Sequence, residues 1–186
     1  MRPIVSAFIF IIAAAGAARA QDAVPPATNF PKGTFDLTLE ADYAHSFQLS
    51  RARVEAVSIG AGYYLFDNFA VNVEAAGYAI DQSGPDSLVS DLDLRIRHHL
   101  INAGRLSLFA DVSGGVSYAT ARTPATGTYF NLTLQPGVGA TWRLHDKLFL
   151  IGGVRYWHIS NARIEGPERN PSINAINGYI GLMATF

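Results

Sequence analysis

Long stretches in which apolar and polar residues alternate constrain the fold of this 186-residue chain more than any other feature. In residues 34–43, TFDLTLEADY, the odd-numbered positions are apolar or aromatic, whereas Asp36, Glu40 and Asp42 occupy even-numbered positions. Such alternation is typical of a β-strand with one apolar and one polar face. The pattern recurs at 69–79, 88–100, 106–118 and 130–144, less cleanly at 51–64 and 148–160, and in the closing stretch 177–186. We therefore expect an all-β fold with eight strands and no helix.

The length of these strands favours a membrane barrel over a soluble β-sandwich. Sandwich strands are usually about five or six residues long, whereas several stretches here reach ten or more, roughly the length that crosses a bilayer at a tilt. The polar faces also carry charges in mid-strand, at Glu40, Glu74, Asp93, Arg95, Asp111 and Arg143. A small barrel can pair these inside while its apolar face meets lipid. The terminal Phe186 resembles the C-terminal signature of bacterial outer-membrane proteins. We therefore predict an eight-stranded antiparallel transmembrane β-barrel of the Gram-negative outer membrane.

The first twenty residues have the organisation of a secretory signal peptide. Arg2 precedes an apolar run over residues 4–17, and Ala18-Arg19-Ala20 places small residues at a cleavage site. The following residues contain three prolines and little periodicity. We expect a signal peptide over 1–20, a leader segment over 21–32 and the outer-membrane barrel over 33–186. Without residues 1–20 the chain has 12 basic and 15 acidic residues, a net charge of −3, and we expect no nucleic-acid partner.

The connections between the expected strands indicate an orientation. Short turns at 65–68, 101–105 and 145–147 alternate with longer connections at 80–87, 120–128 and 161–176. In outer-membrane barrels the short turns face the periplasm and the long loops face outside. The stretch 148–160 then rises towards the exterior, and its last residues lie at the level of the outer leaflet. Because an eight-stranded barrel is only wide enough for its own side chains, we do not expect a porin.

His158 and Ser160 lie at the outer end of that stretch, with the same parity as Leu148, Leu150 and Val154. This parity places both side chains on the lipid-facing side, where a lipid of the outer leaflet is the accessible substrate. A serine hydroxyl becomes a nucleophile when a neighbouring imidazole takes its proton, and alternate residues on one strand face are close enough for that contact. The alternative is that both are interfacial residues of a structural barrel, beside the aromatic residues that precede them.

The segment RYWHISNA at 155–162, with RNPSIN at 169–174 and a last strand ending in Phe, resembles the lipid A 3-O-deacylase (PagL-type) family. The resemblance implies an eight-stranded outer-membrane barrel that is a carboxylic ester hydrolase. Its reaction would be hydrolysis of the ester that links an acyl chain to position 3 of lipid A. It also implies that Ser160 is the nucleophile, His158 the general base and Asn161 a candidate for stabilising the oxyanion. The reaction would pass through a serine ester that water then hydrolyses.

One departure from the family pattern concerns the third member of the triad. The family completes its triad with a Glu shortly before the final strand, and aligning RNPSIN on that pattern places Asn174 there, whereas an ungapped count places Ser172 there. An Asn can orient a neutral imidazole through its carbonyl oxygen, but it cannot stabilise the imidazolium by charge. Glu165 and Glu168, in the preceding loop, are alternative acids if that loop folds back. Arg163 also replaces a small residue of the family.

The remaining candidates concern ligands and partners. His98 and His99 are adjacent in a strand, so they face opposite sides and cannot share a metal; we expect neither a metal nor another cofactor. The loop residues Arg122, Arg163 and Arg169 could meet lipid A phosphates or be ordinary solvated charges. Lipid A of lipopolysaccharide is the expected partner, and a homodimer is left open. The alternative function is a non-enzymatic structural or adhesive barrel like the small OmpA-type barrels, or a family member that has lost activity.

Overall fold

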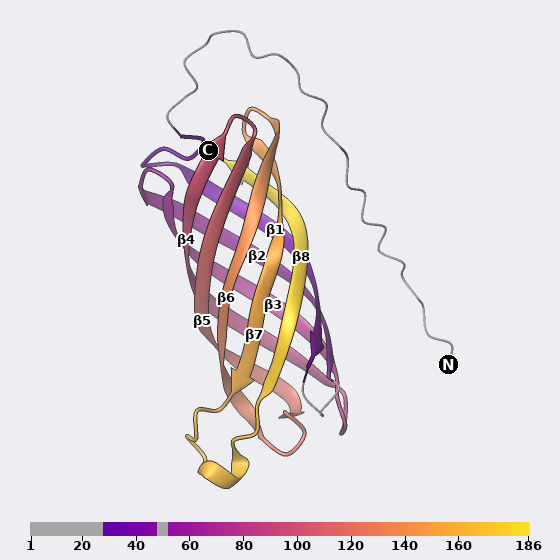
Figure 1. Ribbon diagram of the computed structural model, residues 1–186. Helices are drawn as coiled ribbons and strands as arrows, with labels where there is room; N and C mark the ends of the chain where they lie inside the picture. The colour runs from indigo at the N-terminus through magenta and orange to yellow at the C-terminus, as the bar shows by residue number, and fades with distance from the viewer. Residues whose placement is uncertain (1–27, 48–51) are drawn as a thin grey trace, which may run out of the picture.

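The computed structural model describes residues 28–47 and 52–186; the expected signal peptide and the leader up to residue 27 lie outside the described residues. The described chain forms eight β-strands and one 3-10 turn (Figure 1). The strands are β1 (Phe35–Ser46), β2 (Arg53–Phe66), β3 (Phe69–Asp81), β4 (Ser87–Ala103), β5 (Leu106–Thr123), β6 (Thr128–His145), β7 (Leu148–Ser160) and β8 (Ile173–Thr185). The 3-10 turn η1 (Pro167–Arg169) lies between β7 and β8.

The strands form a closed antiparallel barrel in sequence order. Closure is made by β1 and β8, whose register runs from Asp36 opposite Thr185 to Ser46 opposite Ala175. A closed sheet leaves no row of unpaired backbone groups, which is the condition for a β-structure to stand in lipid. The expected eight-stranded antiparallel barrel is therefore confirmed.

The hairpin of β5 and β6 is longer than its alternation indicates. Its connection is residues 124–127 rather than the expected 120–128, because both strands continue beyond the apolar pattern. Thr123 and Thr128 are paired with each other and their side chains are buried. The register shifts between Tyr118, which pairs with Phe130, and Thr123, so this threonine pair closes the hairpin beyond the last regular pair of the apolar pattern.

The last strand also begins earlier than its clear alternation, at Ile173 rather than at residue 177. Ile173 and Ala175 face the interior and are fully buried. Asn174 lies between them on the outer wall, and Asn177 points inward, so the polar and apolar parities exchange within four residues. Because of this exchange, the alternation of apolar residues does not reveal where the strand begins. Asn174 therefore lies in β8 rather than in the expected loop.

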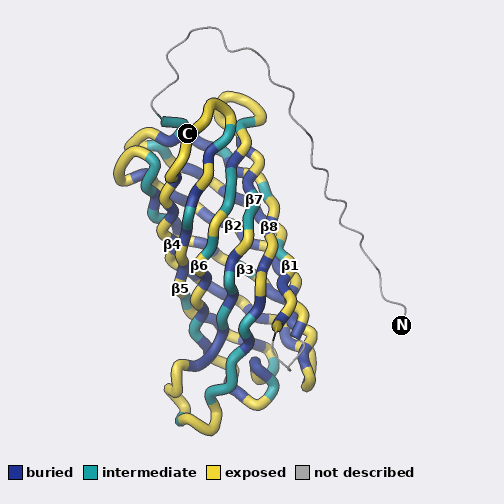
Figure 2. The backbone as a smooth tube through the Cα atoms, in the orientation of Figure 1, coloured by how far each residue is buried: buried dark blue, intermediate teal, exposed yellow. Residues whose placement is uncertain are grey.

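The outer wall of the barrel is apolar. Exposed and buried residues alternate along the strands (Figure 2), and the exposed positions include Leu37 and Leu39 of β1 and Leu92 and Leu94 of β4. Such a wall is suited to contact with lipid chains. No helix in the described residues is long and apolar enough to cross a membrane.

Ion pairs fill the middle of the interior. Arg155 Nη1 lies 2.8 Å from Glu40 Oε2, and Arg95 Nη2 lies 2.8 Å from Glu74 Oε1. Asp111 Oδ2 lies 3.3 Å from the second terminal nitrogen of Arg155. All five side chains are buried, so each charge depends on its partner. Four of the six mid-strand charges that the sequence places on the polar face, Glu40, Glu74, Arg95 and Asp111, thus meet opposite charges inside the barrel. Asp93 instead accepts hydrogen bonds from Ser113, Thr133 and Gln135, and Arg143 stands over the ring of Phe149.

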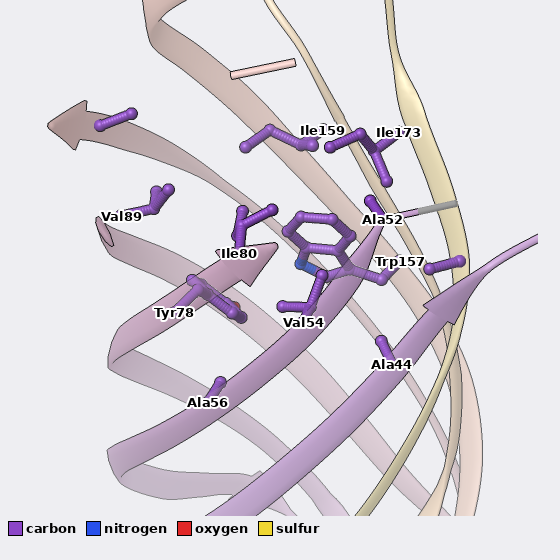
Figure 3. Close-up of a cluster of buried hydrophobic side chains, with 12 residues drawn as sticks. Ala44, Ala52, Val54, Ala56, Tyr78, Ile80, Val89, Trp157, Ile159 and Ile173 are labelled. Atoms are coloured by element: carbon purple, nitrogen blue, oxygen red, sulfur yellow. The ribbon is translucent and has the colours of Figure 1, made fainter. Parts of the chain in front are cut away.

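Inside the barrel, an apolar cluster lies between this ionic layer and the end from which the long connection 161–172 projects. Trp157 stands at its centre, packed among inward-facing residues of several strands (Figure 3). The ring centroids of Trp157 and Tyr78 are 5.5 Å apart, and Ile159 and Ile173 extend the cluster towards the outer rim. This cluster backs the part of the wall that carries the candidate site.

A second cluster closes the opposite end, and it includes a residue of the leader. Phe30 is fully buried, with its ring centroid 3.9 Å from that of His99 and 5.3 Å from that of Tyr64. The Phe30 carbonyl accepts a hydrogen bond of 2.8 Å from the Asn68 amide. The described part of the leader, residues 28–32, is therefore packed against the barrel mouth.

The two ends of the barrel differ as the sequence indicates. The short connections 67–68, 104–105 and 146–147 lie at the end that carries the C-terminus, and the long connection 161–172 projects from the other end (Figure 1). Since short turns are periplasmic in outer-membrane barrels, β7 runs outward and ends at the extracellular side.

Candidate active site

Tyr156, His158 and Ser160 share the outer wall at the extracellular end of β7. Their neighbours Arg155, Trp157 and Ile159 point inward and are buried, so the alternation of a strand turns the first three outward. The expected lipid-facing orientation of His158 and Ser160 agrees with this placement. His158 is half-buried, and Ser160 is 8% exposed.

Three side chains form a continuous hydrogen-bonded row on this wall. His158 Nε2 lies 2.9 Å from Ser160 Oγ, and His158 Nδ1 lies 2.6 Å from Asn174 Oδ1. The first contact follows from the spacing of alternate residues on one strand. The second follows from the β7–β8 register, which pairs His158 directly with Asn174, because residues opposite each other in an antiparallel pair have neighbouring side chains.

The row fixes the tautomer of the neutral imidazole. An amide oxygen only accepts, so Nδ1 of His158 must carry the hydrogen that Asn174 Oδ1 receives. Nε2 is then an acceptor for the Ser160 hydroxyl. This is the tautomer in which a histidine can remove a proton from a serine.

Two further hydroxyls contact the Asn174 amide. Tyr156 donates its phenolic hydrogen to Asn174 Oδ1, and Asn174 Nδ2 donates to Ser172 Oγ at 3.1 Å. The Tyr156 ring lies nearly parallel to that of His158, with centroids 6.4 Å apart and an interplanar angle of 11°. Sequence reasoning treated Tyr156 only as an interfacial aromatic. Its shared parity with His158 and Ser160 was the available signal that it stands in the same row.

The alternative acids lie elsewhere in the loop. Glu165 Oε2 is 3.5 Å from Arg169 Nη1, and both side chains are about half exposed. Glu168 belongs to the 3-10 turn η1, which has no buried residue. Since Asn174 already occupies the Nδ1 side of His158, the structure brings Asn174 rather than either Glu to the imidazole. Ser172 contacts the amide of Asn174, one step further from the histidine.

Asn161 follows the serine and is 2% exposed. Its Nδ2 donates to the carbonyl oxygen of Arg169 at 2.7 Å, and its Oδ1 accepts from the Arg163 amide at 2.9 Å. Ala162 and Arg163 both have positive φ, 50° and 66°, a backbone conformation that non-glycine residues rarely adopt. Asn161 thus ties the sharply turned start of loop 161–172 to its far side. Its role towards an oxyanion stays a prediction.

The loop arginines have local contacts. Arg122 Nη1 donates to the carbonyl oxygen of Gly127 at 3.0 Å and stands over the ring of Tyr129, while Arg169 pairs with Glu165. His98 faces the outer wall and His99 the interior, as their adjacency predicts. Within residues 28–47 and 52–186 no three His, Asp or Glu side chains are grouped as metal ligands would be.

Comparison with solved structures shows the fold. The chain superimposes on Neisserial surface protein A (NspA) with a TM-score of 0.61 at 15% identity, over 82% of this chain and 96% of that one. For the outer membrane enzyme PagL the TM-score is 0.59 at 12% identity, over 76% of this chain and 97% of that one. For the outer membrane protein OprG of Pseudomonas aeruginosa the values are 0.55 and 12%, over 86% and 99%. These likenesses place the chain among outer-membrane barrels.

Comparison of sequences is more specific. No curated protein matches the chain, but the family model described as lipid A 3-O-deacylase (PagL) matches residues 91–183, half of the chain. The matched region contains Tyr156, His158, Ser160 and Asn174. The chain therefore belongs to the lipid A 3-O-deacylase (PagL) family of the Gram-negative outer membrane.

Proposed function

We propose that this protein is an outer-membrane serine esterase that removes an ester-linked acyl chain from lipid A, at the 3-O position that the family's description specifies. The observation that carries the proposal is the hydrogen-bonded row of Ser160, His158 and Asn174 on the lipid-facing wall. Polar groups in this position are remote from soluble substrates. A lipid of the outer leaflet brings its own ester to that wall, at the extracellular end of β7.

The geometry supports acyl transfer in two steps. Ser160 Oγ attacks the ester carbonyl carbon while His158 Nε2, 2.9 Å away, accepts the hydroxyl proton. The bond from the carbonyl carbon to the sugar oxygen then breaks, and His158 returns its proton to that oxygen. Water next attacks the Ser160 ester with His158 again as base, which releases a fatty acid and restores the serine.

Asn174 limits what this row can do. During each proton transfer His158 becomes an imidazolium, and a carboxylate at position 174 would stabilise that charge whereas the amide only orients the ring. We therefore expect slower hydrolysis than a Glu-containing family member achieves. A donor for the oxyanion is also needed, and Asn161, next to the nucleophile, remains the candidate. One Nδ2 hydrogen of Asn161 is engaged by Arg169, so its backbone amide is the donor that we favour.

The test is mass spectrometry of lipid A from cells that express the wild type or Ser160→Ala. We expect the wild type to yield lipid A that has lost one acyl chain at the 3-position, and the variant to yield the unmodified form. Equal acylation in both strains, with both proteins present in the outer membrane, would reject the assignment. Loss of a chain from another position would keep the esterase and correct its regiospecificity.

A second candidate is a barrel of this family without hydrolytic function, and Asn174 is the observation in its favour. The similarity to NspA and OprG shows that the same fold occurs in other outer-membrane proteins. Reaction of purified protein with a fluorophosphonate separates the two, because only an activated serine is phosphonylated quickly. Labelling no faster in the wild type than in His158→Ala would favour the non-enzymatic barrel.

A further inference from the structure

The amide of Asn174 has two unlike ends, and only one orientation suits the proposed reaction. With Oδ1 towards His158, the imidazole carries its hydrogen on Nδ1 and accepts the Ser160 proton at Nε2. With the amide reversed, Nδ2 would donate to Nδ1, which would place the imidazole hydrogen on Nε2. His158 could then no longer act as a base towards Ser160. A carboxylate has no such wrong orientation, so the problem arises specifically from an Asn at position 174.

The neighbours of the amide differ in how well they distinguish its ends. Ser172 accepts from Asn174 Nδ2 in the structure, but a hydroxyl can donate as readily as it accepts, so Ser172 suits either orientation. Tyr156 donates to Asn174 Oδ1. A phenol oxygen can also accept, but its lone pair is delocalised into the ring, so a phenol is a stronger donor and a weaker acceptor than the Ser172 hydroxyl. Reversing the amide would replace the hydrogen bond that Tyr156 donates by a weaker one that it accepts.

Neighbouring rings and the strand register place the Tyr156 hydroxyl at the amide. The Tyr156 ring lies near those of Phe47 and His158, with centroids 6.2 Å and 6.4 Å away. It shares the outward face of β7 with His158, and Asn174 lies opposite on β8. The Tyr156 hydroxyl and His158 Nδ1 therefore both contact one atom, Asn174 Oδ1, which accepts from both.

We propose that Tyr156 is a positioning residue that selects the orientation of the Asn174 amide and thereby the reactive tautomer of His158. The inference rests on the proposed function, since the tautomer matters only if Ser160 is a nucleophile. It assigns the phenol hydroxyl a role that is needed with Asn at position 174 and unnecessary with a carboxylate there.

The test is a pair of Tyr156→Phe substitutions, one in the wild type and one in Asn174→Asp, in purified full-length protein in detergent micelles. The readout is the rate at which a fluorophosphonate phosphonylates Ser160. Loss of one orienting hydrogen bond should slow labelling about five- to tenfold in the wild-type background and less than about twofold in the Asp background. Equal slowing in both backgrounds, or none in the wild type, would overturn the proposal, because a packing role would not depend on residue 174.

A second readout is independent of any reaction. Nitrogen-15 NMR of His158 should show the Nδ1–H tautomer in the wild type and a larger Nε2–H population after Tyr156→Phe; an unchanged tautomer would contradict the proposal. Tyr118→Phe is the matched control, because Tyr118 is 65% exposed on the wall of β5 and its hydroxyl makes no hydrogen bond within the described chain. If lipid A stays intact while the tautomer shifts as expected, the substrate assignment fails and the role of Tyr156 stands.

Discussion

Replacing Asn174 with Asp should convert the row on the outer wall into a Ser–His–Asp triad. Asp has the shape of Asn, so its carboxylate can occupy the position of Oδ1, 2.6 Å from His158 Nδ1, and still accept from Tyr156. Ser172, which accepts from Nδ2 in the wild type, can rotate its hydroxyl and donate instead. The substitution therefore adds a charge without requiring a new geometry.

The gain can be estimated from the electrostatics of the site. An imidazolium and a carboxylate with charge centres about 4 Å apart attract by about 4 kcal/mol at the effective dielectric constant of roughly 20 that applies near a protein surface. Stabilisation that is realised only when His158 is protonated lowers the barrier, and about 4 kcal/mol corresponds to roughly a thousandfold in rate. Since His158 and Asn174 are both half-buried, screening reduces this figure, and we expect a gain of about a hundredfold.

The assay is release of fatty acid from purified lipid A in mixed micelles, compared between the wild type, Asn174→Asp and Asn174→Glu. Glu should gain less than Asp, because its extra methylene does not fit a contact that is already short. Ser160→Ala in the Asp background is the control and should abolish release. If Asn174→Asp folds, is labelled at Ser160 and is no faster than the wild type, stabilisation of the imidazolium does not limit the reaction and the reasoning is refuted.

Three further expectations follow from the structure. Trp157→Ala should lower the free energy of unfolding by about 3–5 kcal/mol, measured by guanidinium titration in detergent, and an equal loss from the lipid-facing Leu94→Ala would contradict the central role of the Trp157 cluster. Phe30→Ala should release residues 28–32 from the barrel mouth, so that the amide donating to the Phe30 carbonyl exchanges its hydrogen faster; unchanged exchange would show that the leader is held without this ring. The double variant Glu165→Gln/Glu168→Gln should retain lipid A hydrolysis within about twofold, because neither carboxylate contacts His158, and a large loss would restore one of them as the acid.

The barrel was predictable because its physics is local and repeated. Alternation in β1, β4 and β5 reflects a wall with lipid on one side and paired charges on the other. Each strand shows this alternation in its own sequence, independently of the others. What the pattern missed lies where that rule is broken. Near the end of β5 the apolar Ala119 is buried inside and Thr120 is exposed on the wall. In β8, Asn174 lies on the outer wall whereas Asn177 points inward, so a periodicity argument ends both elements too early.

The outward pair of His158 and Ser160 was predictable from strand parity, but the third member of the row was not. Loop 161–172 has no periodicity, so counting residues leaves Asn174 and Ser172 as competitors and allows Glu165 or Glu168 to fold back. The register of β7 and β8 removes this freedom, because an acceptor for His158 Nδ1 must stand opposite His158, at position 174. The same register explains the contact between Tyr156 and Asn174. Tyr156 lies two residues before His158 on the same face of β7, and its hydroxyl reaches the Asn174 amide diagonally. In a barrel of this design the chemistry of residue 174 decides both the charge available to the histidine and whether a neighbouring hydroxyl is needed to orient it, so substitutions at 156 and 174 should be coupled.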